Sequence, residues 1–371
     1  MKFADFIEEI RLKKLDWYII RKFITTFFMA LLLIILIVII FDISEKIDDF
    51  VSNEVPLKSI VFDYYANFIP YFMNMFSPMF VFITVIFFTS RMAANSEIIA
   101  ILSCGVSFKR FMRPYMVSAA IIALFSLALN LWIIPNANKP RMEFETAYVT
   151  DYSGAKALRN AHYQISPGTF AYVESFSKWN NTAYKFTLET IKDNRIVSKL
   201  SADQAVWDST LCGWTLKRWT LREYGPDLQD KVTMGEKMDT VISLTIKDFK
   251  KTRDYESQLN KRELDEYIAM KRMRGDADIK AALIQKHTRY AMPFSAFILT
   301  IIGVALSSRK RRGGTGWNLA LGIALSFSYI LFQKFSEMFV ATDTLPAFVA
   351  IWLPNVIFTI IAIILYRLAP K

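Results

Sequence analysis

Residues capable of enzymatic chemistry are few in this sequence, and none stands in a recognisable catalytic pattern. The two histidines, His162 and His287, lie far apart and have no nucleophile or metal-ligating set at a familiar spacing. The glycine-rich stretch 313–316 lacks the GxxxxGK pattern in which backbone amides cradle phosphates, so a flexible polar turn is its simplest interpretation. We therefore predict that the chain is not an enzyme and holds no metal and no ATP of its own.

One pair of opposite charges stands inside an apolar segment. Lys334 and Glu337 are three residues apart, which places them on one face of a helix. The simplest interpretation is a local ion pair near a membrane surface, with the lysine stem extended toward water. The alternative is that Lys334 meets the anionic head group of a lipid in the outer leaflet. Ionisable residues are otherwise sparse in the apolar segments, which argues against a carrier driven by proton or sodium gradients.

Long apolar segments dominate the chain. Of its 371 residues 53% are hydrophobic, including 31 Phe, and the mean hydropathy is +0.27. A helix needs about 20 apolar residues to cross the hydrocarbon core of a bilayer. The first run is too long for a signal-peptide core, and no small-x-small cleavage motif follows it. We predict six transmembrane helices, at about 23–41, 62–90, 114–134, 290–307, 317–340 and 346–368.

The net charge of +11 is explained by membrane topology rather than by nucleic-acid binding. Basic residues cluster before the first apolar run, between the second and third (91–113), and between the fourth and fifth (309–312). Such clusters stay in the cytoplasm. We therefore predict cytoplasmic N- and C-termini, with the segment 135–258 outside. The two cysteines, Cys104 and Cys212, would then lie on opposite sides of the membrane and could not pair.

The segment 135–258 has mixed composition and predicts a β-domain. Alternating apolar and polar residues indicate strands at 169–175, 184–190, 202–207, 214–224 and 241–246, with a hairpin turn at 208–213. Several short strands at this spacing favour an antiparallel sandwich or jelly roll. The predicted fold class is thus a membrane helical bundle with an inserted antiparallel β jelly-roll-like domain.

Two further segments have helical periodicity. At 95–107 an apolar face within a polar stretch predicts a short cytoplasmic helix that lies against the membrane or a partner. At 260–286 Leu264 and Ile268 recur at helical spacing until Gly275, which predicts an amphipathic connector back to the bilayer. We therefore divide the chain into 1–134 with three spans, 135–258 with the β-domain, and 259–371 with the connector and three spans.

Several local motifs in this order resemble the permease subunits of the lipopolysaccharide-export ABC transporter, the LptF/LptG or YjgP/YjgQ family. The resemblance covers the whole chain. Each motif is weak alone, but their order around six spans and one β-domain is specific. The motifs are Leu15-Asp16-Trp17-Tyr18-Ile19, similar to "LDRYI"; Ser96-Glu97-Ile98 with Ser103-Cys104-Gly105-Val106-Ser107; Pro293, Gly303 and Arg311-Arg312-Gly313-Gly314; Pro346 with Trp352-Leu353-Pro354-Asn355; and Ala202, Trp207 and Trp214-Thr215-Leu216.

The resemblance implies a mechanism and partners. Two such permeases form the membrane pathway in the bacterial inner membrane, and a cytoplasmic ABC ATPase that binds ATP and Mg docks on a coupling helix of each. In that helix Glu97 would contact an arginine of the ATPase, Ile98 and Leu102 would fill a groove, and Gly105 would let the helix end closely packed. The periplasmic β-domain would receive lipopolysaccharide and pass it to β jelly-roll bridge proteins.

The resemblance also suggests substrate contacts. Phe170, Tyr172 and Phe186 are candidates to line an apolar path for acyl chains in the β-domain, where each exposed CH₂ would cost about 0.8 kcal/mol. Some family members carry lysines near the outer end of the first span that suit lipid phosphates. Here that stretch is mostly acidic. The candidate cations are Lys46, Arg141, Arg289 and Lys334.

Other functions remain open at this point. The same scaffold would serve an ABC permease for another amphipathic lipid or a lipoprotein, which a mass spectrum of bound lipid distinguishes. A membrane-tethered sensor or scaffold would have no ATPase partner. Within the family, the segment 264–268 followed by Gly275 favours the G-type subunit.

Overall fold

The computed structural model describes residues 13–149, 159–177, 179–209, 211–225, 230–242, 244, 249, 255–275, 279–308 and 314–369. The chain divides into two compact units. One comprises Met1–Tyr148, Ser257–Lys261 and Leu283–Lys371 and is helical; the other comprises Val149–Glu256 and Arg262–Ala282 and contains the sheet.

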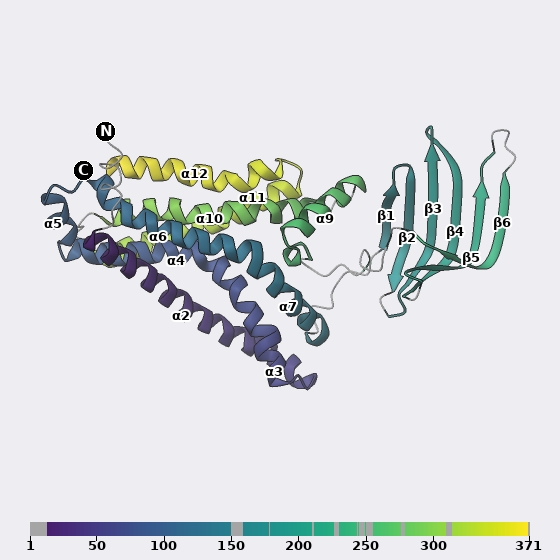
Figure 1. The fold of residues 1–371 in the computed structure, drawn as a ribbon, viewed down its shortest axis with the longest axis horizontal. Coiled ribbons are helices and arrows are strands. Elements are labelled where there is room, and N and C mark those ends of the chain that lie inside the picture. Colours follow the sequence, from purple (N-terminus) through teal and green to yellow (C-terminus); the bar gives the residue numbers. More distant parts are fainter. Residues whose placement is uncertain are drawn as a thin grey trace. The chain divides into compact units, whose positions relative to one another are not determined.

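Among its described residues, the helical unit contains six helical rods that are long and apolar enough to cross a membrane. The predicted fold class of six spans with an inserted antiparallel β-domain is therefore confirmed (Figure 1). The first three rods extend well beyond the predicted apolar runs. In chain order, the six rods are α2 (Lys14–Ser52); α3 (Leu57–Ser59), the π-helix η1 (Ile60–Tyr65) and α4 (Ala66–Ala94); α6 (Phe108–Ala128), the π-helix η2 (Leu129–Ile133) and α7 (Ile134–Tyr148); α10 (Ile279–Ser307); α11 (Gly314–Ala341); and α12 (Ala347–Leu368).

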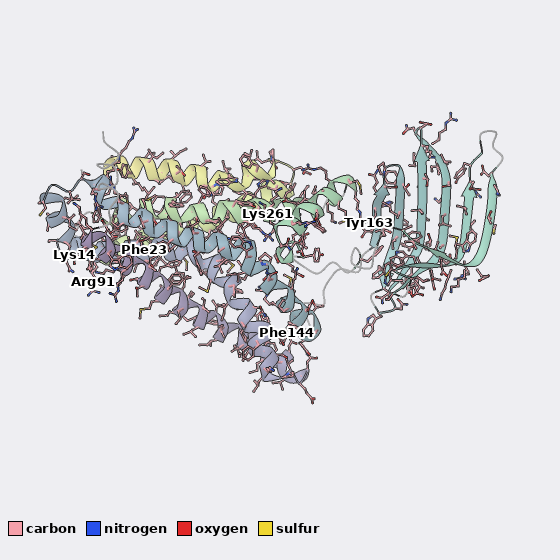
Figure 2. The ribbon with its side chains drawn as sticks, viewed as in Figure 1. Lys14, Phe23, Arg91, Phe144, Tyr163 and Lys261 are labelled. Carbon is pink, nitrogen blue, oxygen red and sulfur yellow. The ribbon has the colours of Figure 1, made fainter. Side chains whose placement is uncertain are left out.

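One end of the helical unit collects basic residues and the short helix α5 (Glu97–Ser103). Figure 2 shows Lys14 and Arg91 at this end, whereas Phe144 lies toward the opposite end. Helix α2 begins and helix α12 ends beside α5 (Figure 1). The basic loop 309–312 lies outside the described residues. The basic end of the bundle is therefore the end at which the N-terminal and C-terminal spans meet.

Apolar packing at the basic end joins α2, α4, α5 and α6. The buried cluster includes Ile19, Phe23, Phe88, Ile98 and Tyr115. The rings of Phe88 and Tyr115 stack with centroids 5.3 Å apart, and Tyr115 hydrogen-bonds Thr89 at 3.0 Å.

Close backbone approach and a buried polar network complete the bundle. A Cβ on Gly303 would lie 2.8 Å from Cγ1 of Val85, so α10 approaches α4 more closely than a side chain would allow. Asn74 on α4 donates to Asn130 at 3.1 Å and accepts from Ser126 at 2.7 Å. Such bonds satisfy polar groups that a bilayer cannot hydrate.

The second unit contains one antiparallel sheet with its strands in sequential order. The strands are β1 (Arg159–Ser166), β2 (Thr169–Ser177), β3 (Thr182–Lys192), β4 (Arg195–Asp208), β5 (Gly213–Glu223) and β6 (Lys231–Thr240). This is a meander, and among the described strands the Greek-key crossings of a strict jelly roll are not seen. Helix α9 (Lys261–Met273) belongs to this unit from Arg262 onward and confirms the predicted helical periodicity after residue 260.

Four predicted strands coincide with β2 to β5, but the strand predicted at 241–246 is wrong at its described residues 241, 242 and 244, while 243, 245 and 246 lie outside the described part of the chain. Strand β6 ends at Thr240, and Val241, Ile242 and Leu244 lie outside any strand. Leu244 is buried in the sheet's core, and its carbonyl accepts a hydrogen bond from Nε1 of Trp214 at 2.8 Å. Apolar alternation in this segment therefore reflects packing onto the sheet. Strands β1 and β6 were not predicted.

A transverse crease crosses all six strands. None of the paired positions in the described strands falls on the row Asn160, Glu174, Lys185, Asp203, Arg218 and Glu236, although the register is the same on both sides of it. Every second member of the row, on β1, β3 and β5, has a positive φ between 47° and 52°.

The crease turns both halves of each strand toward one core. Buried residues flank it three positions apart, as in Ala183 and Phe186 or Ala202 and Ala205, where a flat strand would place them two or four apart. On the outer side Lys185 pairs with Glu174 at 2.9 Å. The sheet is thus bent, with apolar side chains on the inside of the bend.

Candidate functional site

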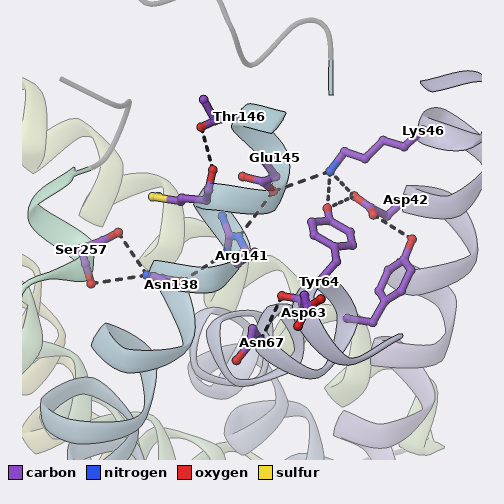
Figure 3. Close-up of polar contacts among 12 residues, drawn as sticks. Asp42, Lys46, Asp63, Tyr64, Asn67, Asn138, Arg141, Glu145, Thr146 and Ser257 are labelled. Carbon is purple, nitrogen blue, oxygen red and sulfur yellow. Dashed lines mark hydrogen bonds and ion pairs between the residues drawn. The ribbon is translucent and has the colours of Figure 1, made fainter. Parts of the chain in front are cut away.

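A cluster of charged and aromatic side chains lies where α2, η1 and α7 meet (Figure 3). Lys46 of α2 donates to Oδ1 of Asp42 at 2.8 Å and also to the hydroxyl of Tyr64. The hydroxyl of Tyr65 donates to Oδ2 of Asp42 at 3.0 Å. Glu145 of α7 lies 3.8 Å from Nζ of Lys46. We call Asp42, Lys46, Tyr64, Tyr65, Arg141 and Glu145 the outer cluster.

Arg141 completes the charge balance of the outer cluster. Its Nε lies 3.4 Å from Oε1 of Glu145, and its guanidinium sits 4.9 Å from the ring centre of Tyr71. Two cations therefore face two carboxylates in a site where Glu145 is 3% exposed. Burial of these charges is tolerable because each has a partner. Any phosphate that binds Lys46 or Arg141 has to compete with these carboxylates.

The same face of α7 holds the segment 257–261, through which the chain re-enters the helical unit. Nδ2 of Asn138 donates to Oγ of Ser257 at 3.1 Å (Figure 3). Nη2 of Arg289 donates to the carbonyl of Leu259 at 2.7 Å. Arg289 is buried, so its visible role is to anchor this returning segment. Of the predicted cations, Lys46 and Arg141 thus help to connect α2, η1 and α7, and Arg289 holds the returning segment 257–261.

Lys334 differs from the other predicted cations in exposure. Its Nζ lies 3.0 Å from Oε2 of Glu337, so the local ion pair expected from their spacing forms. The Lys334 side chain nevertheless remains 67% exposed. It is therefore the most accessible of the four predicted substrate cations.

The short helix predicted at 95–107 is present as α5, bracketed by two residues in the left-handed region. Ser96 has a φ of 63° and Gly105 a φ of 82°. A Cβ on Gly105 would meet nothing within 4 Å, so within this chain the backbone conformation, rather than close packing, favours glycine. Glu97 begins the helix and accepts from Nδ2 of Asn95 at 3.1 Å.

Helix α5 has one face in the bundle and one outside it. Ile98 is buried in the apolar cluster, and Leu102 packs partly against it. Ile99 is exposed. Two of the residues expected to fill a partner's groove, Ile98 and Leu102, therefore face their own bundle, while Ile99 and Glu97 remain on the outward part of the helix.

The three predicted lining residues of the β-domain lie on opposite faces of the sheet. Phe186 is buried on the inner side of the bend, paired across strands with Val173. Phe170 is exposed, and Tyr172 donates to Oδ1 of Asn160 at 2.8 Å on the other face. An apolar path on the inner face would therefore include Phe186 but exclude Phe170 and Tyr172.

The residues that pair with the predicted cations of the outer cluster were not predicted from the sequence. Asp42, Tyr64 and Glu145 are as central to the outer cluster as Lys46. One signal was present, because Asp42 and Lys46 are four residues apart, as are Arg141 and Glu145, which is the spacing of helical ion pairs. Among the residues that the structure describes, no group of three or more His, Cys, Asp or Glu side chains is placed to hold a metal ion.

Comparison with known proteins agrees with this layout. A family model described as "Lipopolysaccharide export system permease LptF/LptG" matches residues 17–368. No curated protein matches the chain at the threshold applied.

Removing one carboxylate tests whether the outer cluster holds the three helices together. We expect Glu145→Gln to destabilise the protein by roughly 3 kcal/mol, because the buried Arg141 would lose the carboxylate with which it pairs. The thermal unfolding midpoint of the purified chain in detergent, at fixed scan rate, measures this loss. Glu143→Gln is the matched control, since Glu143 is exposed on the same helix. Equal midpoints for both variants would show that the cluster contributes no stability.

Proposed function

The chain belongs to the lipopolysaccharide export system permease family LptF/LptG, and from that premise we propose how it couples ATP hydrolysis to lipid release. It is a multi-pass inner-membrane permease that exports lipopolysaccharide and has no ATPase domain. The family implies a partner ATPase, permeases of the same family and lipopolysaccharide as substrate. The observation that carries the function is the match over residues 17–368 on six spans with an inserted sheet.

We propose that the basic end of the helical unit is cytoplasmic and that the β-domain is periplasmic. The support is electrostatic, because Lys14, Arg91 and the segment around α5 gather at one end of the bundle (Figure 2). Positively charged loops remain on the cytoplasmic side during insertion. Both termini would then be cytoplasmic, and the outer cluster would lie at the periplasmic surface.

We propose that the partner ATPase docks on α5 and that Glu97 makes the ionic contact. Helix α5 is short, stands at the basic end, and has Ile99 exposed beside Glu97. A carboxylate flanked by apolar side chains suits an arginine set in an apolar groove. ATP and Mg would be bound by the ATPase alone.

We propose that acyl chains pass along the inner side of the bent sheet and that Lys334 meets a phosphate of the head group. The inner side carries Val173, Phe186 and Leu216, which shield apolar chains from water. Lys334 is suited to the phosphate because it is exposed and paired only with its helical neighbour Glu337 among the contacts of the described residues. From this sheet the lipid would pass to periplasmic β jelly-roll bridge proteins.

We further propose that this chain is the G-type subunit, so that its sister permease is the F type. The support is the segment 264–268 followed by Gly275, which the structure describes as α9 and its C-terminal turn. Mass spectrometry of the purified complex identifies the sister chain.

The two native cysteines test the orientation directly. Both are exposed and free, Cys104 after α5 and Cys212 before β5. In spheroplasts, a membrane-impermeant maleimide should label the variant Cys104→Ser, which keeps Cys212. It should not label Cys212→Ser until the cells are lysed. The opposite pattern would place the β-domain in the cytoplasm and refute the proposed direction of export.

Charge reversal at α5 tests ATPase docking. We expect Glu97→Arg to weaken binding of the ATPase about 100-fold, so that it no longer co-purifies, because attraction at a buried contact becomes repulsion. Asp343→Arg is the control, since Asp343 is an exposed acidic residue between α11 and α12. An ATPase that still co-purifies with Glu97→Arg would remove Glu97 from docking.

Lys334 is tested against its own ion-pair partner. We expect Lys334→Gln to reduce lipopolysaccharide binding to the purified complex by up to about fivefold, the size of one exposed ionic contact. Glu337→Gln should leave binding equal or stronger, because it frees the lysine from its competitor. If both variants bind equally, Lys334 does not contact the substrate.

A further inference from the structure

The first span is tied to the start of α6 by an ion pair between buried Asp16 and half-buried Arg110. Oδ1 of Asp16 accepts a hydrogen bond from Nη1 of Arg110 at 2.7 Å, and Oδ2 accepts one from Nη2 at 2.5 Å. The same Oδ2 accepts from the backbone amide of Lys13 at 2.7 Å. The Asp16 side chain is 3% exposed. A two-pronged contact of this kind fixes both the separation and the orientation of the groups it joins.

Arg110 directly follows the segment that carries α5. It lies in the first turn of α6, and its backbone amide donates to Oγ of Ser107, the N-cap, at 3.3 Å. Ile98 of α5 and Phe108 of α6 are buried in the same apolar cluster as Ile19, which lies one turn beyond Asp16 on α2. Helix α5, the start of α6 and the N-terminal end of α2 therefore form one packed body.

Helix α2 extends this body to the other end of the bundle. It is a single helix of 39 residues, about 58 Å long at 1.5 Å per residue, and its sequence contains no proline or glycine. Asp16 lies in its first turn, and Asp42 and Lys46 of the outer cluster lie toward its other end. A displacement of the N-terminal end of α2 therefore also moves the part of the same unbroken helix that belongs to the outer cluster.

We infer that Asp16 and Arg110 are positioning residues that make the first span move with α5. The inference rests on the proposal that the ATPase docks on α5. When the ATPase displaces α5, Arg110 moves with it, and the two-pronged contact carries Asp16 and the N-terminal end of α2 along. Without the pair, α5 moves while α2 stays in place. ATP hydrolysis then continues with little lipid release.

The test uses the complete complex of both permeases and the ATPase in proteoliposomes that contain lipopolysaccharide. Asp16→Asn keeps the acceptor for the Lys13 amide but removes the charge, and Arg110→Gln removes the other partner. We expect both to retain the assembled ATPase and its hydrolysis rate and to lose about tenfold in lipid released per ATP hydrolysed, within the range of coupling between sites. Arg110→Lys keeps the charge without the two-pronged geometry, and its release should be intermediate.

Lys109→Gln is the matched control, because Lys109 is the exposed neighbour of Arg110 in the same turn. It should release lipid like the unmodified complex. Unchanged release in Asp16→Asn and Arg110→Gln would overturn the inference. So would loss of the assembled complex in all three pair variants, which would assign the pair to folding alone. An ATPase that stays bound to Glu97→Arg would refute docking at α5, and that measurement is independent of release.

Discussion

The absence of water inside a bilayer is the constraint on which this structure depends. Every polar group at depth needs a partner within the protein, and every charge near the membrane surface needs either water or an opposite charge. Three sets of contacts serve this requirement. Asp16 and Arg110 pair at one end of the bundle, Asn74, Ser126 and Asn130 bond inside it, and the outer cluster balances two cations with two carboxylates at the other end.

These polar contacts also decide which helices act together. The ion pair of Asp16 and Arg110 joins α2 to α6 next to α5, and the outer cluster joins α2 to η1 and α7. Apolar packing along α2 is less extensive, and many of its side chains between Met29 and Phe41 face away from the unit. Such a surface suits lipid or a second permease. The polar ends then give the first span defined positions without enclosing it in the bundle.

In the sheet, backbone conformation decides which side chains face the apolar interior. Left-handed conformations at Asn160, Lys185 and Arg218 bend the sheet along one row and shift the alternation of side chains by one position. Apolar residues on both sides of the row then face the same interior. A non-glycine residue in this region costs about 1–2 kcal/mol, which the apolar core formed on the inside of the bend offsets.

The sequence alone determined the number of spans, the insertion of an antiparallel β-domain between the third and fourth, and the short helix at the basic end. Length of apolar runs, placement of Lys and Arg, and period-two alternation are local properties, so they survive without coordinates. Strand β6 was not predicted because most of its side chains are exposed at the edge of the sheet. The segment 241–246 was predicted wrongly as a strand because Leu244 packs inward without belonging to one. Only the tertiary structure decided that Lys46 and Arg141 share Glu145, that Asp16 meets Arg110, and that Phe170 and Phe186 lie on opposite faces. The Lys46–Glu145 and Asp16–Arg110 contacts join residues distant in sequence, and contact at that range is set by how helices pack rather than by any local pattern.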